Sequence, residues 1–378
     1  MARGTLFTGF SWLNLTAALA PWPFAVQGAS ILGAYGLAGL LTACMTWLAA
    51  GRLWSPTCLF GVLALAGLVV FGNMEMQRPL PGGTPLRVGI AQGNIDQSLK
   101  WDPAYQKATV DAYLELSAGL MKESAPGLVV WPETAMPFYF QDGDALTASV
   151  VRFARENNVP LLTGAPAYTR NADGYTLYNR VYLVPPDGAA PTFYDKTHLV
   201  PFGEYIPFGD YLPFLSKLVH GVGDFKAGHN AAPLRYGDLA LGVLICYEAI
   251  FPELAQADVE AGANILVNVS NDAWFGRSSA PLQHLDLAAL RAVEQGRVQV
   301  RATNTGNSAV IDPQWRVQAP IGLFTAENLA YGEVVLVSDT TPFHRHRGLI
   351  HWSCAGIAAI FGALALLSAP HTRSRTIR

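Results

Sequence analysis

Apolar residues are concentrated at the two ends of this 378-residue chain, whereas apolar and polar positions alternate through its middle. Four apolar stretches lie at the ends, at residues 6–20, 27–50, 57–71 and 349–368. A helix needs about 20 apolar residues to cross the hydrocarbon core of a bilayer, and the second and fourth stretches are long enough. The first is interrupted by Asn14, Pro21 and Pro23. We expect membrane-spanning helices, with a buried core helix as the alternative for each stretch.

The residues between these ends carry the pattern of a layered α/β domain. Strands are predicted at residues 86–92, 127–131, 161–164, 177–184, 239–246, 264–269, 308–311 and 333–337. Helices are predicted at residues 103–123, 146–157, 252–261 and 282–300. Several strands are continuous apolar runs, which is typical of sheets covered on both faces. A linker rich in proline and glycine precedes the domain, so the chain is expected to divide into residues 1–75, 76–347 and 348–378.

The charge distribution excludes one class of function and predicts an orientation. Lys and Arg total 25 for a net charge of −3, without a basic run inside the domain, so a nucleic-acid surface is not expected. Arg52 separates the second and third apolar stretches, and Arg373–Arg378 follow the fourth. Because cytoplasmic segments are enriched in Lys and Arg, three N-terminal spans would carry the chain outward and the last would return it. The domain is then expected outside the cytoplasm, although Arg78, Arg345 and Arg347 oppose this bias.

Cys246 is the one cysteine of residues 73–348, and it directly follows the apolar run at residues 239–245. It has no cysteine within the domain to pair with, and a single thiol avoids mispairing in an oxidising compartment. A thiol at the end of a buried strand is a candidate nucleophile. The alternative is a structural cysteine, because free cysteine is among the most buried residue types.

Two charged side chains are further candidates, one at the end of a predicted strand and one in a loop. Glu133 follows the apolar run at residues 128–132, and we interpret it as a candidate general base, with an ordinary surface glutamate as the alternative. Lys196 lies in an apolar and aromatic loop and could stabilise an anion, unless it is a solvated lysine paired with Asp195. Glu204 is a second candidate acid in that loop.

Two common kinds of active site do not fit the pattern. The Gly-x-Ser-x-Gly motif of serine hydrolases does not occur, and no spacing of His, Cys and Asp suggests a metal site. The eight histidines are scattered, and His198 and His284 are interpreted as structural or hydrogen-bonding residues. We therefore expect neither a metal nor a cofactor.

Glu133, Lys196 and Cys246, in this order and in the contexts Trp-Pro-Glu, Asp-Lys and Cys-Tyr-Glu, resemble the catalytic triad of the nitrilase superfamily. Longer motifs resemble its apolipoprotein N-acyltransferase branch, at residues 92–95, 98–102, 131–135, 198–205, 271–276, 283–284 and 301–306. The resemblance covers residues 86–340 and implies an α-β-β-α sandwich flanked by transmembrane helices. Members of this branch carry more N-terminal spans, so a shortened N-terminal bundle is expected.

The resemblance also implies an activity and a place in the cell. The protein would be a multi-pass enzyme of the bacterial inner membrane, with its catalytic domain on the periplasmic side. Cys246 would accept an acyl chain from a phospholipid, expected to be phosphatidylethanolamine, and pass it to the α-amino group of a diacylated apolipoprotein. Glu133 would act as base, and Lys196 and the backbone N–H of Tyr247 would hold the oxyanion.

Three supporting residues follow from the same resemblance, and one segment is added by its own composition. Glu204 is expected to orient the lysine or the base, and Glu248 to brace the turn after the nucleophile. Trp101 is expected to contact lipid or acceptor, with plain core packing as its alternative. The apolar segment at residues 201–220 is expected to cover the site at the bilayer surface, or otherwise to pack on its own domain.

Two other functions stay open on the sequence. A membrane-tethered amidase that hydrolyses a small C–N bond would use the same three residues, but it would not need four apolar spans. A non-catalytic membrane scaffold with a degenerate domain would have lost at least one of the three, and all three are present.

Overall fold

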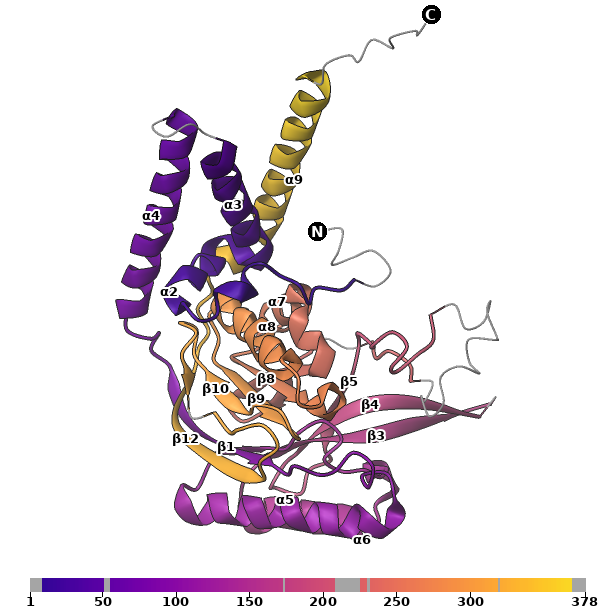
Figure 1. Ribbon diagram of the computed structural model, residues 1–378. Coiled ribbons are helices and arrows are strands. Elements are labelled where there is room, and N and C mark those ends of the chain that lie inside the picture. Colours follow the sequence, from indigo (N-terminus) through magenta and orange to yellow (C-terminus); the bar gives the residue numbers. More distant parts are fainter. Residues whose placement is uncertain are drawn as a thin grey trace, which may run out of the picture.

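Two six-stranded β-sheets stacked face to face form the centre of the protein (Figure 1). The computed structural model describes residues 9–50, 55–172, 174–207, 225–229, 232–318 and 320–368. The first sheet has the order β12-β1-β2-β3-β4-β5 and the second the order β11-β10-β9-β8-β7-β6. Apolar side chains of both sheets, such as Val88, Val130, Val243 and Val267, meet between them and form the central core.

The strands of the first sheet are β1 (Thr84–Gln92), β2 (Leu128–Val130), β3 (Leu161–Asn171), β4 (Gly174–Val184), β5 (Thr192–Asp195) and β12 (Glu327–Leu336). Those of the second are β6 (Leu234–Tyr236), β7 (Leu239–Ile245), β8 (Ile265–Ser270), β9 (Gln299–Thr303), β10 (Ala309–Ile311) and β11 (Val317–Gln318). In each sheet three neighbouring strands are parallel, β1-β2-β3 and β7-β8-β9, and the outer pairs are antiparallel. The carboxyl ends of parallel strands therefore meet at one edge of each sheet.

Helices cover the outer face of both sheets. Helices α5 (Pro103–Glu123) and α6 (Ala145–Glu156) pack on the first sheet, and α7 (Pro252–Glu260) and α8 (Ala280–Gln295) pack on the second. Helix α5 begins where it does because the Asp102 side chain accepts a hydrogen bond from Ala104 N, and Pro103 takes the first helical position. The expected α-β-β-α sandwich is confirmed.

Two details of the predicted elements are wrong. The helix predicted at residues 282–300 ends at Gln295, because Gly296 adopts φ +64 and turns the chain into β9. The predictions also missed β9 and the short strands β5, β6 and β11, and they gave only the last part of β12.

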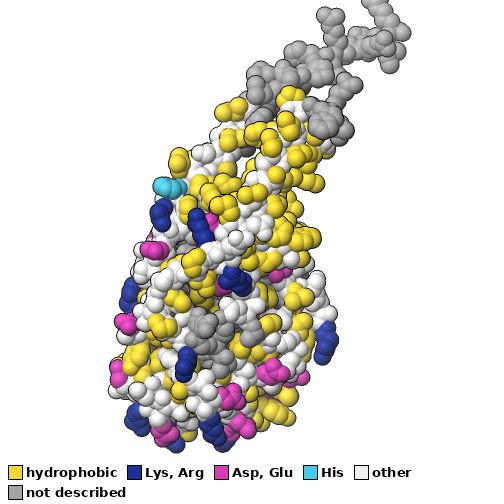
Figure 2. Space-filling model, turned by 90° about the vertical axis from the view of Figure 1, so that its left-hand side faces the viewer, with side chains coloured by type: hydrophobic (Ala, Val, Ile, Leu, Met, Phe, Trp, Pro, Cys, Tyr) yellow, Lys and Arg dark blue, Asp and Glu magenta, His cyan; other side chains and the backbone are white. Residues whose placement is uncertain are grey.

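Helices α3 (Ala29–Ala50), α4 (Pro56–Gln77) and α9 (Pro342–Ser368) project from one side of the sandwich (Figure 1). Among the described residues, two helices are long and apolar enough to cross a membrane, at Ala29–Ala49 and Pro56–Gln77. The fourth apolar stretch lies within α9. Figure 2 shows hydrophobic side chains gathered over the projecting helices, whereas Lys, Arg, Asp and Glu side chains lie mainly over the sandwich.

The lower part of α3 is anchored to the sandwich at a kink. Gly33 has φ +69, and the ring of Phe343 occupies the space that a Cβ atom at Gly33 would need. The kink releases the N–H of Ala34 from the helix, and this N–H donates to Glu294 Oε1 of α8 at 2.6 Å. A buried backbone donor freed in this way must find a partner, so the glutamate fixes the helix to the domain.

The first apolar stretch does not form a spanning helix over its described residues, 9–20, and that prediction is wrong there; residues 6–8 lie outside the described part. It contains only the short 3-10 helix η2 (Ala17–Leu19) and is followed by the four-residue helix α2 (Pro23–Val26). Residues 9–12 instead lie against the sandwich, where Phe10 stacks on Tyr247 with ring centroids 6.4 Å apart and Trp12 lies 5.4 Å from His284.

Candidate active site

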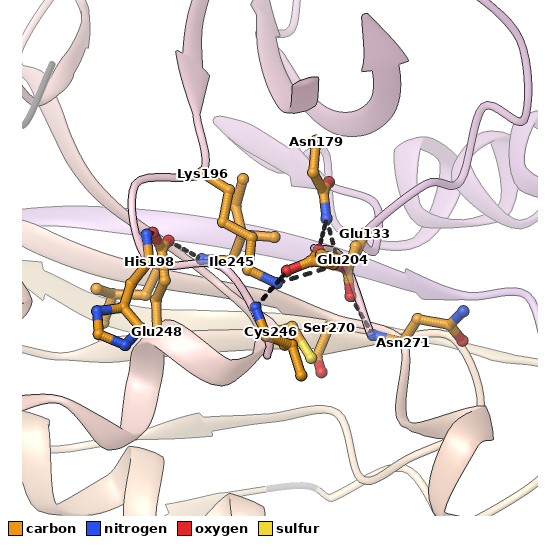
Figure 3. Close-up of polar contacts among 12 residues, drawn as sticks. Glu133, Asn179, Lys196, His198, Glu204, Ile245, Cys246, Glu248, Ser270 and Asn271 are labelled. Carbon is orange, nitrogen blue, oxygen red and sulfur yellow. Dashed lines mark hydrogen bonds and ion pairs between the residues drawn. The ribbon is translucent and has the colours of Figure 1, made fainter. Parts of the chain in front are cut away.

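Glu133, Lys196 and Cys246 come together between the two sheets (Figure 3). Glu133 lies just beyond β2 and Lys196 directly follows β5, so both belong to the first sheet. Cys246 directly follows β7 and belongs to the second. Lys196 Nζ lies 3.8 Å from Glu133 Oε1. The structure thus brings the expected base, cation and thiol close together.

The Glu133 carboxylate is almost buried and is held by one donor on each oxygen. Asn179 Nδ2 donates to Oε1 at 2.7 Å, and the backbone N–H of Asn271 donates to Oε2 at 2.9 Å. These bonds fix the plane of the carboxylate in its pocket. An oriented carboxylate between the sheets is suited to accept a proton from a neighbouring group.

Lys196 is buried and lies closest to Glu204. Its Nζ donates to Glu204 at 2.9 Å, and Glu204 also accepts from Asn179 Nδ2 at 2.8 Å and from Val200 N at 2.8 Å. Burial alone would lower the pKa of Lys196, but Glu204 and then Glu133 outweigh it and raise the pKa well above its usual value. The lysine is therefore a permanent cation. Glu204 orients it, and is linked to Glu133 both through Asn179 and through the lysine itself.

Asn179, which joins the two carboxylates, was not predicted from the sequence. It lies on β4 two residues before Val181 and four before Leu183, both of which face the other sheet. Because side chains alternate along a strand, Asn179 points the same way. A polar residue in the inward register of an apolar strand was the signal that could have revealed it.

Cys246 begins the 3-10 helix η5 (Cys246–Ile250) and has φ +51, a left-handed conformation that residues with a Cβ rarely adopt. Burial, followed by the negative charge of Glu133, raises the pKa of its thiol to about 12, against the opposing effect of Lys196. The sulfur lies beside Ser270 in Figure 3. Cys246 is thus a neutral thiol at rest, and it needs a base at the moment it attacks.

Glu248 ties the turn of the nucleophile to the segment that carries the lysine. Its carboxylate is fully buried, and Oε2 accepts from Ile245 N at 2.7 Å. Oε1 accepts from Thr197 N at 2.7 Å, Thr197 Oγ1 at 3.0 Å, His198 N at 2.9 Å and Tyr194 Oη at 2.9 Å. The sequence led us to expect a brace for the turn after Cys246. The bonds show a wider role, since they join both sheets across the site.

Tyr247 is the second residue of η5. The first N–H groups of a helix have no partner inside the helix, so its backbone N–H is available to an anion. Its side chain points to the N-terminal segment, where the hydroxyl donates to Gly9 O at 3.1 Å. The role of its N–H in holding an oxyanion stays a prediction.

The segment at residues 97–101 borders the site beside Glu133. Gln97 Oε1 accepts from Asn271 Nδ2 at 2.7 Å, and Lys100 is buried with its Nζ 3.3 Å from the backbone oxygen of Glu133. Burial lowers the pKa of Lys100 to about 8. Lys100 was also missed from the sequence. Trp101 is 51% exposed, which excludes plain core packing and leaves its contact with a substrate as a prediction.

The expected cover over the site is described only in part. Residues 201–207 form a turn in which Pro201 and Tyr205 are bridged, and Phe202 is exposed. Residues 208–220 of the predicted segment lie outside the described residues.

Comparison with known proteins places this geometry in a family. The carbon-nitrogen hydrolase family model matches residues 87–340. The chain is 39% identical over 373 residues to the apolipoprotein N-acyltransferase of Geobacter metallireducens, covering 96% of this chain and 71% of that protein. It is 36% identical over 377 residues to that of Nitrosomonas europaea, covering 97% and 72%.

A solved structure supports the fold independently. A cysteine-to-alanine mutant of the Nesterenkonia AN1 amidase from the nitrilase superfamily superimposes with a TM-score of 0.51. The two are 20% identical, and the match covers 73% of this chain and 99% of the amidase. At that identity the likeness bears on the fold alone.

Proposed function

Because the chain belongs to the carbon-nitrogen hydrolase family and, within it, to the apolipoprotein N-acyltransferases, we propose that it moves a fatty acyl chain from a membrane glycerophospholipid to the α-amino group of a diacylated apolipoprotein. This reaction is the last step of lipoprotein maturation. The observation that carries the proposal is the buried group of Glu133, Lys196 and Cys246 in a chain with these relatives.

The first half of the reaction forms a thioester. Glu133 accepts the thiol proton as Sγ of Cys246 attacks the ester carbonyl carbon, which becomes tetrahedral and carries a negative oxygen. Lys196 and the backbone N–H of Tyr247 stabilise that oxygen, each donor contributing about 3–4 kcal/mol in comparable sites. The C–O bond to glycerol then breaks, and Glu133 returns its proton to the leaving oxygen. A lysophospholipid departs.

The second half transfers the acyl chain to the amine. The neutral α-amino group of the N-terminal diacylglyceryl-cysteine attacks the thioester carbonyl, and Glu133 accepts one amine proton. The C–S bond breaks, the sulfur regains the proton, and the product carries an amide. One nucleophile serves both halves, so the kinetics are of the ping-pong type.

The projecting helices support a place in the bacterial inner membrane with the sandwich on the periplasmic side. The end of α3, the start of α4 and the end of α9 all lie away from the sandwich (Figure 1). The sequence segments next to those ends carry Arg52 and Arg373–Arg378, and positive charge favours the cytoplasmic side. Within the described residues, the candidate spans of the N-terminal part are α3 and α4, where three spans were expected from sequence. Phosphatidylethanolamine is the proposed acyl donor.

The test follows an acyl group through the protein. The protein is placed in phospholipid vesicles in which phosphatidylethanolamine carries labelled acyl chains. It is then digested, and the mass of the peptide that contains Cys246 is measured by mass spectrometry. We expect the acyl mass on Cys246 in the wild type and in the matched control Cys354→Ala, whose cysteine is exposed and lies on α9. Cys246→Ala should lack it. Adding a diacylated lipopeptide should then move the label to the peptide amine.

Two outcomes would contradict the proposal. Acyl-enzyme that accumulates in Cys246→Ala would exclude the cysteine as nucleophile. Label that reaches only water in the presence of the lipopeptide would make the protein a phospholipid hydrolase and exclude acyl transfer to an amine.

A further inference from the structure

Three charged or titratable side chains lie completely buried behind the nucleophile, on the side of β7 and β8 away from Glu133. They are Asp272, His284 and Arg301. Asp272 Oδ2 accepts from Arg301 Nη2 at 2.7 Å, and its Oδ1 accepts from Ser270 Oγ at 2.7 Å. His284 Nδ1 lies 3.0 Å from Asp272 Oδ1 and 3.1 Å from Arg301 Nη2. The proposed reaction assigns none of the three a role.

This cluster reaches the nucleophile through one hydrogen bond. His284 Nε2 lies 3.0 Å from the backbone carbonyl oxygen of Cys246. A carbonyl oxygen can only accept, so Nε2 carries a proton and donates it. That holds whether Nδ1 is protonated and donates to Asp272 or is bare and accepts from Arg301. Asn268 Nδ2 approaches the same oxygen at 3.5 Å, a longer and weaker contact.

The carbonyl of Cys246 and the N–H of Tyr247 belong to the same peptide group. No described peptide bond is cis, and in a planar trans peptide the C=O and the N–H point in opposite directions. A donor that fixes the carbonyl therefore fixes the direction of the N–H on the other side. It also polarises the group, because hydrogen bonds in a chain strengthen one another.

The hydrogen bond from His284 also helps to hold the unusual backbone conformation of Cys246. The φ of +51 is a strained conformation for a cysteine, and such strain persists only where the surroundings hold it. His284 is one of the groups that hold it, since its bond to the carbonyl opposes rotation of the peptide.

We propose that His284, backed by Asp272, is a positioning residue that orients and polarises the Cys246–Tyr247 peptide so that its N–H stabilises the oxyanion. This inference rests on the proposed function. It assigns the cluster to the transition state of both half-reactions, because each passes through a tetrahedral oxyanion. The histidine acts through the backbone carbonyl of Cys246.

The test compares two substitutions at His284. His284→Phe keeps a ring beside Trp12 but removes the donor to the carbonyl. His284→Gln keeps a donor at about the same place but loses the link to Asp272. His344→Phe is the matched control, because His344 is likewise held through Nδ1, by Gln295 Oε1 at 2.7 Å, but lies on α9 away from the nucleophile.

The informative measurement is the carbonyl stretch of the acyl-enzyme, read by infrared difference spectra with ¹²C- and ¹³C-labelled acyl chains in the absence of acceptor. A polarised thioester absorbs at lower frequency than a free thioester in an apolar solvent. We expect the band of His284→Phe to move toward that of the free thioester, the band of His284→Gln to lie between, and the band of His344→Phe to stay with the wild type. We expect kcat of His284→Phe to fall about 10- to 100-fold, which is less than the loss of an oxyanion donor itself would cause. Its KM should stay within about twofold of the wild-type value.

The outcomes separate the inference from the function beneath it. No acyl group on Cys246 of the wild type would overturn the proposed function, and this role with it. If the wild type carries the acyl group on Cys246 but the carbonyl band and kcat of His284→Phe equal those of the wild type, only the positioning role is overturned. If His284→Phe does not fold, His284→Leu takes its place, because it also lacks the donor, and an unmoved band and kcat in that variant overturn the role.

Discussion

Replacing Glu204 with glutamine should disable the cation of the site while leaving all three proposed catalytic residues intact. Lys196 lies 2.9 Å from Glu204 and 3.8 Å from Glu133. Glu204→Gln preserves size and removes one negative charge. The lysine then has Glu133 as its one carboxylate within 4 Å among the described residues.

The magnitude follows from these distances. At an effective dielectric constant of about 20, the pair at 2.9 Å is worth about 6 kcal/mol and the pair at 3.8 Å about 4 kcal/mol. If the lysine moves toward Glu133 and recovers about half of what it loses, about 3 kcal/mol remains unrecovered. Since about 1.4 kcal/mol corresponds to a factor of ten, we expect the rate of Cys246 acylation to fall about 100-fold.

The pH dependence gives the prediction a second signature. In the wild type the pKa of Lys196 is raised far above its usual value, mainly because Glu204 and Glu133 outweigh the effect of burial. The lysine thus stays charged throughout an assay from pH 7 to about 10. Removing Glu204 lowers this pKa, so the neutral lysine appears first at the alkaline end. We expect an alkaline fall in rate that the wild type lacks.

The assay is the single-turnover acylation of Cys246 by a fluorescent phospholipid, followed on a denaturing gel at each pH. Glu253→Gln is the matched control, since Glu253 lies on α7 and its nearest cation, Arg347, is 4.0 Å away at the surface. Glu204→Gln that acylates at the wild-type rate across the whole pH range would refute the reasoning from the ion pair.

Two further predictions concern residues beside Glu133. Burial lowers the pKa of Lys100 to about 8, so between about pH 8 and 10 the unfolded chain binds more protons and the folded state gains stability as the pH rises. Lys100→Met lacks this gain, so at pH 7 its free energy of unfolding, measured by thermal unfolding, should exceed that of the wild type by up to about 3 kcal/mol. This difference should vanish by about pH 10. A difference that stays constant with pH would contradict the burial of a charged amine. In Gly164→Ala the new Cβ would meet Thr134 N at 2.5 Å and Glu133 Cα at 2.8 Å, which are backbone atoms. A shift of the base by about 1 Å should lower the rate of Cys246 acylation about 100-fold. Gly82→Ala, whose new Cβ has no atom within 4 Å, should leave that rate unchanged. Equal rates for the two variants would exclude the steric argument.

Much of the fold was predictable because several central strands are largely apolar, and β2 and β7 are apolar for their whole length. Strands β1, β7 and β8 lie close to where the hydrophobic runs predict them. The edge strands β5, β6 and β11 were not predictable, because each is two to four residues long and exists only through pairing with its neighbour. The N-terminal apolar stretch shows the same limit, since residues 9–12 lie on the sandwich through aromatic contacts made some 235 to 270 positions away.

The sequence by itself indicated the three central residues of the site, because Glu133 and Cys246 each follow a predicted strand and all three stand in motifs that resemble those of the nitrilase superfamily. Only the tertiary structure decided how they are held. Asn179 bridges two carboxylates, and His284 reaches the carbonyl of Cys246. These contacts join elements from both sheets and their covering helix, so their distances are set by how the layers pack and by no local pattern along the chain.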